Sequence, residues 1–298
     1  MTARLLALAL LLSFTISTSP AQRALSIEDE LFGMVLGIEG KHGIERGEFV
    51  KTQLKRMGVS FFTAPFDSLR VMGTDTVNLS GENIVVRLGR GPKRIVVGAH
   101  YDCVPESPGA NDNGGGVAVL LALIKSMRET RWNYGIDFCF FDQEENGLIG
   151  SKMYVRKFAD KSTHLAMVNL DVEGSGNTVY IGPVGGGDDS LIMPLARQAA
   201  KLTKFPFEER EIYPDSDHES FMRAGFENIS VSVVPAGDVD KLVAMVKNGW
   251  RVNSEKDLPD VMKVMHSPND GSQFVTPSAL TTSYSFTKKL VELLNGVR

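Results

Sequence analysis

Two strings of histidine and carboxylate residues carry most of the chemistry that this sequence could perform. One runs from His100-Tyr-Asp102 to Asn111-Asp112-Asn113, and the other is Asp142-Gln-Glu144-Glu145-Asn146-Gly147. Imidazole nitrogens and carboxylate oxygens are ligands that divalent cations accept. Each string follows a short apolar run of the kind that forms a β-strand. The pattern therefore indicates a pair of metal ions and the chemistry of a metal-dependent hydrolase.

The strands that precede these residues are expected to bring them together. His100 and Asp102 follow one predicted strand, and Asp171 follows another. Glu144 and Glu145 follow a third. In open α/β sheets, ligands gather at the carboxyl ends of the strands. Like charges in one crevice repel each other and shift their pKa values, and divalent cations would remove that repulsion.

The spacing of His100 and Asp102 suits a metal ligand and its support. A metal-bound imidazole generally donates its second N–H to a carboxylate, and Asp102 is predicted to accept that bond from His100. A related string, His266-Ser-Pro-Asn-Asp270, lies near the C-terminus. Taken alone it favours a loop, with a capping role for Asp270. This string supports the metal hypothesis only in combination with the other histidine and carboxylate strings.

Alternating helix and strand patterns predict a three-layer α/β/α sandwich around a mixed, mostly parallel sheet. Helices are expected at 27–40, 44–57, 115–127, 189–202, 218–224 and 277–294, and strands at 83–88, 94–100, 136–141, 165–170, 178–181 and 229–234. The turn signal at 89–92 favours a hairpin or neighbouring strands on its two sides. The irregular stretch 236–265 is predicted to be a surface excursion bordering the site.

Composition and charge fit one globular catalytic domain. The 298 residues are 43% apolar and 23% charged, and the formal net charge is -4. No basic run stands out as a partner for a phosphate backbone, so binding of nucleic acid is not expected. Cys103 follows one strand end whereas Cys139 lies inside the next strand, so two free thiols are favoured over a disulfide.

Residues 1–21 have the features of a signal peptide. Arg4 precedes an apolar stretch from Leu5 to Ile16, and small residues around Ala21 offer a cleavage point. The stretch is shorter than the roughly 20 residues that a bilayer span needs. We expect residues 22–298 to form a single domain without a stable membrane span, exported to the periplasm or secreted.

Six strings now make a family resemblance specific. They are Gly98-Ala-His-Tyr-Asp102, Gly109-Ala-Asn-Asp-Asn-Gly-Gly115, Phe141-Asp-Gln-Glu-Glu-Asn-Gly-Leu-Ile-Gly-Ser151, Asn169-Leu-Asp171, Ser216-Asp-His218 and His266-Ser-Pro-Asn-Asp270. In order and spacing they resemble the co-catalytic zinc aminopeptidases of the bacterial leucyl aminopeptidase type. Glutamate carboxypeptidases and glutaminyl cyclases belong to the same broad group. The resemblance extends from about Asn83 to the C-terminus.

The resemblance implies a ligand set for two divalent cations, with zinc favoured. Asp112 would bridge the two metals. His100 and Asp171 would complete one site, and Glu145 and His266 would complete the other. The expected substrates are peptides.

The resemblance also implies roles beyond the metals. Glu144 would be the general base that takes a proton from water and returns it to the leaving amine. Tyr213 would stabilise the oxyanion, with a packing role as an equal alternative. His218 would shape the site wall without binding metal. The family has a cis peptide after the bridging aspartate, which here would join Asp112 and Asn113.

Three functions remain open from the sequence. The first is a dinuclear aminopeptidase, because the residues that follow Asp112 and Glu145 look like those of aminopeptidases. The second is a glutaminyl cyclase, although Met265 precedes His266 where animal cyclases carry tryptophan. The third is a non-catalytic ectodomain on a peptidase scaffold, which the complete ligand set argues against. The oligomeric state, the metal and the preferred side chain are not fixed by the sequence.

Overall fold

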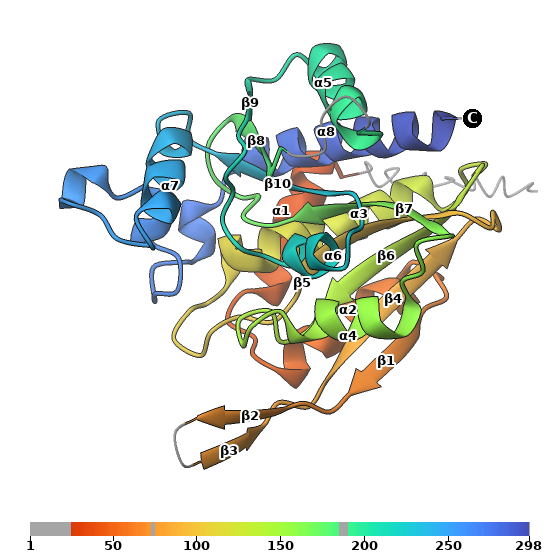
Figure 1. Cartoon of the computed structure of the whole chain (residues 1–298), viewed down its shortest axis with the longest axis horizontal. Coiled ribbons are helices and arrows are strands. Elements are labelled where there is room, and N and C mark those ends of the chain that lie inside the picture. The colour runs from red at the N-terminus through yellow and green to blue at the C-terminus, as the bar shows by residue number, and fades with distance from the viewer. Residues whose placement is uncertain (1–24, 73–74, 185–189, 298) are drawn as a thin grey trace, which may run out of the picture.

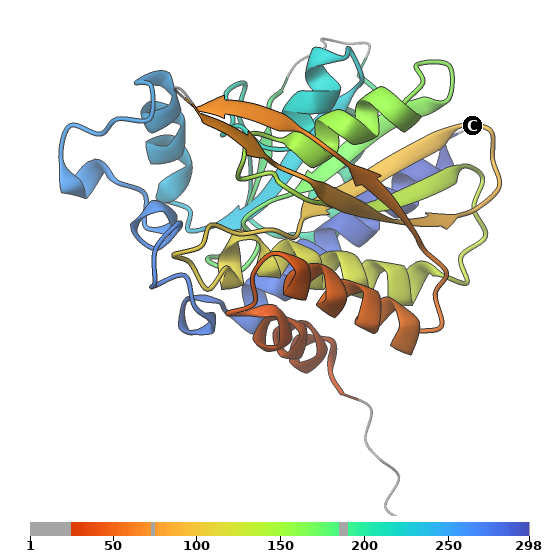
Figure 2. The same cartoon turned by 90° about the horizontal axis from the view of Figure 1, so that it is seen from below.

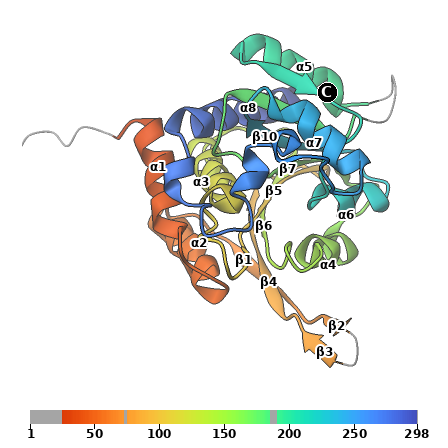
Figure 3. The same ribbon diagram turned by 90° about the vertical axis from the view of Figure 1, so that its left-hand side faces the viewer.

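The chain folds into three layers, with one large sheet between two groups of helices (Figure 1). The computed structural model describes residues 25–72, 75–184 and 190–297. Figure 3, which looks along the sheet from the side where the central strands end, shows helices covering both faces. This confirms the predicted three-layer sandwich.

The central sheet has eight strands in the order β1-β4-β6-β5-β7-β10-β8-β9. Its strands are β1 (Phe62–Phe66), β4 (Gly81–Leu88), β5 (Arg94–His100), β6 (Gly135–Phe141), β7 (His164–Leu170), β8 (Thr178–Gly182), β9 (Phe207–Glu209) and β10 (Asn228–Val234). The four central strands, β6, β5, β7 and β10, run parallel, and antiparallel pairs join β4 and β8 to them. The carboxyl ends of the four parallel strands therefore meet at one edge.

The expectation that 83–88 and 94–100 are neighbouring strands is wrong, because β6 lies between β4 and β5. Strands are about 4.8 Å apart, so crossing one intervening strand requires roughly 10 Å. The five residues 89–93 can extend further than that. Gly89 helps the crossing, since a Cβ there would lie 2.3 Å from the carbonyl oxygen of Tyr134, in the loop that enters β6.

Helices cover the two faces unequally (Figure 2). One face carries α1 (Ile27–Ile38), α2 (Ile44–Arg56), α3 (Gly116–Met127) and α8 (Pro277–Gly296), with α5 (Ile192–Thr203) against α8. The other face carries α4 (Ile149–Phe158) and α6 (His218–Arg223). Helix α7 (Asp238–Lys247) stands at the side of the molecule, within the predicted excursion.

Local sequence explains how several helices begin. Ser26 caps α1 by accepting a hydrogen bond from the backbone N–H of Asp29, and Thr276 caps α8 in the same way. Pro277 occupies the first turn of α8, where its missing N–H costs little. Helix α3 is buried along most of its length because it lies directly behind the parallel strands.

The six predicted strands and six predicted helices are all present, with boundaries that shift by a few residues. The sequence did not predict β1, β9 or the small hairpin of β2 (Leu69–Met72) and β3 (Asp75–Asn78), which projects from the body (Figure 3). Residues 1–21, the predicted signal peptide, lie outside the described residues. Among the helices that are described, none is both long and apolar enough to cross a membrane.

A buried carboxylate anchors the end of β6 that lies away from the polar strings. The Asp137 side chain is fully buried and accepts hydrogen bonds from Arg94, from Arg87 at 3.3 Å and from the Tyr154 hydroxyl at 2.6 Å. These bonds tie β4, β5 and α4 to β6. The strand that leads to Glu144 and Glu145 is thereby fixed at its start.

We expect Asp137→Ala to lower the free energy of unfolding by about 3–5 kcal/mol, because two arginines then lose a buried counter-charge. Urea unfolding of the variant would measure the loss. Tyr154→Phe removes one donor and leaves the ion pairs, so it should cost about 1–3 kcal/mol. Equal losses in the two variants would contradict a central role for the carboxylate.

Candidate metal centre

Three strands and two loops bring the predicted ligands to one edge of the sheet. His100 is the last residue of β5, and Asp171 directly follows β7. Asp112 lies in a helical turn, Ala110–Gly115, that leads into α3 and is kinked at Asp112 and Asn113. The peptide between Asp112 and Asn113 is cis, as the resemblance implied.

The kinked turn is held by its own side chains. The Asn113 carboxamide donates to the carbonyl of Leu170 at 2.8 Å and accepts from the N–H of Gly116 at 3.0 Å. A Cβ at position 116 would lie 2.3 Å from the Asn113 side-chain oxygen, so glycine is needed for this close approach. These bonds fix Asp112 relative to the end of β7.

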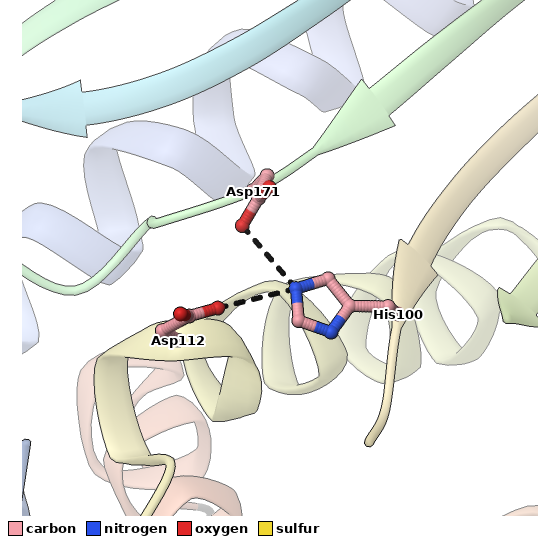
Figure 4. Close-up of side chains that lie close together, drawn as sticks. All are labelled: His100, Asp112 and Asp171. Carbon is pink, nitrogen blue, oxygen red and sulfur yellow. Dashed lines mark ion pairs between the residues drawn. The ribbon is translucent and has the colours of Figure 1, made fainter. Parts of the chain in front are cut away.

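His100 lies between two carboxylates (Figure 4). Its Nε2 atom is 3.2 Å from Oδ1 of Asp112 and 3.4 Å from Oδ1 of Asp171. Burial alone would lower the pKa of His100, but the carboxylates around it raise that pKa well above its ordinary value. This is the first of the two predicted ligand sets.

The second ligand set uses the other oxygen of Asp112. The Nε2 atom of His266 is 3.1 Å from Oδ2 of Asp112 and 3.0 Å from Oε2 of Glu145. Hydrogen bonds to these carboxylates raise the pKa of His266 to about 10. Asp112 therefore faces one imidazole with each oxygen, which is the geometry that a bridging carboxylate needs.

The donor atoms fit a pair of divalent cations. Within each set, one ligand atom from every residue lies within 4.8 Å of the others. Oε1 of Glu145 is buried without a hydrogen-bond partner, and Oδ1 of Asp171 has only the 3.4 Å approach of His100, which is too long and poorly aligned for a good hydrogen bond. A buried carboxylate oxygen without a partner is costly, and a cation would satisfy both atoms. Imidazole and carboxylate oxygen together suit zinc, manganese or cobalt.

Asp102 supports the site differently from the prediction. Its carboxylate Oδ1 is 3.5 Å from Nδ1 of His100, and its main-chain oxygen is nearer, at 3.2 Å. The two carboxylate oxygens instead accept hydrogen bonds from the backbone N–H groups of Glu144 and Glu145, at 3.1 and 3.2 Å. Asp102 thus couples the loop after β5 to the turn after β6.

The directions of the two glutamates are set by that turn. Adjacent residues of a β-strand point to opposite faces, but β6 ends at Phe141 and both glutamates lie in the tight turn that follows it. Gln143 adopts a φ of 59° to enter the turn. The hydrogen bonds that their N–H groups donate to Asp102 then hold Glu144 and Glu145 side by side at the cluster.

Glu144 lies outside the two ligand sets that share Asp112, but its carboxylate forms a third cluster of potential ligand atoms with His100 and Glu145. Burial raises the pKa of Glu144 well above its ordinary value, His100 opposes this effect, and Asp217 and Asp171 add to it. A carboxyl with a raised pKa holds a proton more readily at neutral pH, which suits a group that accepts and returns one.

Asp217 and Asp270 are buried carboxylates that the sequence argument did not place in the site. Asp217 is fully buried, and burial raises its pKa to about 7. Asp270 accepts hydrogen bonds from the N–H groups of Asn111 and Asp112 and from the Ser107 hydroxyl. The position of Asp270 four residues after His266 was a sequence signal for a role in the site, but the sequence taken alone favoured a capping role for Asp270.

A cavity of about 350 Å³ opens beside the ligands. Its far wall is largely apolar and includes Tyr180, Val234, Leu242, Trp250, Met262 and Met265. Several of these residues belong to 236–265, so the prediction that this excursion borders the site is confirmed. A pocket of this size with a few polar groups at one end is typical of a small-molecule site.

Tyr213 lines the cavity, with its hydroxyl hydrogen-bonded to Ser232 and its ring 4.6 Å from that of Tyr180. The Tyr213 side chain therefore both packs against a neighbouring ring and lines the same cavity as the predicted ligands. His218 contacts Ser230 at 3.2 Å, and burial lowers its pKa to about 4. Among the described residues, His218 belongs to none of the ligand clusters. Cys103 and Cys139 are free, as predicted.

A model of peptidase family M28 matches residues 83–290, which is more than half of the chain. The chain belongs to peptidase family M28. It is similar to the aminopeptidase YwaD of Bacillus subtilis, with 32% identity over 143 residues that cover 46% of this chain and 31% of that protein. An aminopeptidase of Pseudomonas aeruginosa is 33% identical over 165 residues, covering 51% and 30%. The chain spans about a third of the length of these relatives.

Solved structures share the fold of this M28 chain. The zinc aminopeptidase BSAP of Bacillus subtilis superposes with a TM-score of 0.70 at 15% identity, covering 91% of this chain and 96% of that one. The glutaminyl cyclase of Porphyromonas gingivalis superposes with a TM-score of 0.66 at 21% identity, covering 89% and 98%. The predicted relationship to the aminopeptidases is confirmed by the family match and the relatives, and the cyclase shares the fold.

Removing each glutamate should separate their roles. We expect Glu144→Ala to keep its bound metal while losing activity by a factor of about 100 or more. Glu145→Ala should lose metal as well, because it removes a ligand that faces His266. Metal content per chain, measured by atomic emission after desalting, distinguishes the two. Equal metal loss in both variants would contradict this division.

Asp270→Asn tests the support of the bridging carboxylate. The new amide group cannot accept all the hydrogen bonds that Asp270 accepts, so one donor near Asp112 is left unpaired. Loss of such a partner typically costs about 10–100-fold in metal affinity, which zinc titration would measure. Asp260→Asn is the matched control because Asp260 is an exposed residue that pairs with Lys263. Wild-type affinity in Asp270→Asn would refute the role.

Proposed function

We propose that this chain is a dinuclear zinc exopeptidase that removes N-terminal residues from peptides. The observation that carries the proposal is the division of the Asp112 carboxylate, whose two oxygens face His100 and His266 separately. Zinc ions bound there would act as Lewis acids, which make water more acidic and a peptide carbonyl more electrophilic. Family membership supports the same chemistry.

Glu144 is the general base in this proposal. It lines the cavity beside His100, and burial, together with the nearby Asp217 and Asp171 carboxylates, raises its pKa. Its carboxylate would take a proton from the attacking water and deliver it to the nitrogen of the leaving amine. Asp102 contributes by holding the backbone of Glu144 through a 3.1 Å hydrogen bond.

Tyr213 is proposed to help stabilise the oxyanion of the tetrahedral intermediate. Its ring forms part of the cavity wall, and its hydroxyl contacts Ser232, which in turn donates to the main-chain oxygen of Asp171. The hydroxyl is therefore held near the first ligand set as a donor to Ser232, and it would exchange that bond for one to the oxyanion. Removal of a donor of this kind typically costs about 2.7–4 kcal/mol in activation free energy.

The cavity supports a substrate with an apolar N-terminal side chain. Beyond the ligands its wall consists mainly of aliphatic, aromatic and methionine side chains, with Ser232 and Asp215 among the polar residues. A peptide whose first side chain is large and apolar would bury that side chain against Leu242 and Met262. A glutamine side chain would have fewer partners for its amide group there.

A glutaminyl cyclase is the second candidate. One observation favours it, since the Porphyromonas gingivalis cyclase matches this chain over nearly its full length. Cyclisation would join the N-terminal amino nitrogen to the side-chain carbonyl of glutamine, with Glu144 moving the proton, and would release ammonia instead of an amino acid. The apolar cavity favours the aminopeptidase. A non-catalytic role is disfavoured because both ligand sets and Glu144 converge at one cavity.

We also propose that residues 1–21 direct export, so that the enzyme acts in the periplasm or outside the cell. The sequence pattern of Arg4 followed by an apolar stretch supports this proposal. Peptides would then be its substrates in that compartment.

The proposed function is tested by incubating residues 22–298 with zinc and two peptides that begin with leucine or glutamine. Mass spectrometry reads the products. We expect loss of the complete leucine residue, with Glu144→Ala as the inactive control. Dialysis against a chelator should abolish this activity, and added zinc should restore it.

Each other result has a defined meaning. Loss of ammonia alone from the glutamine peptide would establish the cyclase. No product from protein that demonstrably contains two metal ions would refute both candidate reactions.

A further inference from the structure

A buried arginine contacts the loop that connects two parts of the metal centre. Arg46, from α2, is 0% exposed. It lies outside the ligand sets and outside the region that the family model matches. The loop in question, 101–109, runs from the residue after His100 to the helical turn that carries Asp112.

All three hydrogen bonds of the Arg46 guanidinium go to main-chain carbonyl oxygens of this loop. Nε donates to Tyr101, Nη1 to Pro108 at 3.5 Å and Nη2 to Gly109 at 3.1 Å. One side chain therefore joins the first residue of the loop to its last two. A guanidinium has donors in a rigid fork, which suits simultaneous bonding to several fixed acceptors.

Both ends of the loop lead directly to carboxylates of the site. Tyr101 precedes Asp102, whose carboxylate holds the backbone of Glu144 and Glu145. At the other end, Gly109 lies three residues before Asp112. A shift of either end would displace groups that must keep their separation for two cations to share Asp112.

The surroundings leave Arg46 little freedom. Gly109 has a φ of 65°, and a Cβ there would lie 2.6 Å from Nη1 of Arg46 and 2.8 Å from Cβ of Cys103. On α2, a Cβ at Gly47 would lie 3.3 Å from the hydroxyl oxygen of Tyr101. The helix and the loop are packed closely enough for the guanidinium to set the distance between the loop ends.

The charge of Arg46 is a second reason to connect it with the loop. A buried guanidinium is costly unless its charge is compensated. Its described hydrogen bonds are to carbonyl groups, whereas the adjoining centre contains an excess of buried carboxylates, among them Asp102, Asp112 and Asp270. The main-chain oxygens of the loop are the groups that face this charge, so the guanidinium and the loop stabilise each other.

We propose that Arg46 is a positioning residue that sets the geometry of the metal centre from outside it. It acts by holding the two ends of loop 101–109 and thereby the carboxylates of Asp102 and Asp112. The proposal rests on the proposed metal-dependent function and adds a residue from the N-terminal helices to it.

The test compares Arg46→Met, Arg46→Lys and the control Arg56→Met, which changes an exposed arginine at the end of the same helix. Zinc affinity is measured by competition with a chromophoric chelator, at a temperature where circular dichroism shows each variant to be folded. We expect Arg46→Met to bind zinc about 10–100-fold more weakly than the wild type. Arg46→Lys should bind zinc with intermediate affinity, because lysine keeps the positive charge but has fewer hydrogen-bond donors.

A merely structural role would lower the melting temperature of Arg46→Met and leave the zinc affinity of the folded protein unchanged, and that result would overturn the proposal. If Arg46→Met does not fold, Arg46→Lys decides in the same way. Failure of both to fold would also overturn it, because Arg46 would then support the whole fold and not the ligands. The readout needs no substrate. A wild type that binds zinc without hydrolysing peptides would refute the proposed function alone.

Discussion

The central physical constraint in this structure is the repulsion among carboxylates gathered at one edge of the sheet. Asp102, Asp112, Glu144, Glu145 and Asp171 all lie there, together with two imidazoles. Negative charges at this density and burial are stable only when cations or directed hydrogen bonds face them. The surrounding loops supply those bonds to the Asp102 and Asp270 carboxylates, whereas Oε1 of Glu145 has no hydrogen-bond partner and would be satisfied by a cation.

The fold meets this constraint in two ways: the parallel strands fix some of these residues, and contacts between loops fix the others. The parallel strands fix where His100 and Asp171 emerge, and Asp137 fixes the start of β6. The final positions of Asp112 and the two glutamates are set by side-chain contacts between loops. Main-chain N–H groups are the donors in most of these contacts, so the carboxylates orient the backbone as much as the backbone orients them.

Sequence reasoning predicted the sandwich, most of the strands and the two ligand sets, because apolar periodicity and the order of the ligand strings are local signals. It failed where the answer depends on contacts between distant segments. The insertion of β6 between β4 and β5 requires knowing that the loop before β6 packs on the turn at Gly89. The partner of Asp102 is a turn 42 residues away along the chain, and spacing with His100 could not reveal it. Asp217 and Arg46 were missed since burial of a charged residue has no signature in sequence alone.

The excursion after β10 contributes both to the cavity wall and to a predicted ligand set. Trp250, Met262 and Met265 line the cavity, and His266, a predicted ligand with a φ of 56°, directly follows Met265. The shape of the wall and the position of this imidazole are therefore encoded in one continuous stretch of backbone. An insertion or deletion that reshapes the wall also moves His266, whereas exchange of a side chain on the wall leaves the backbone of His266 in place.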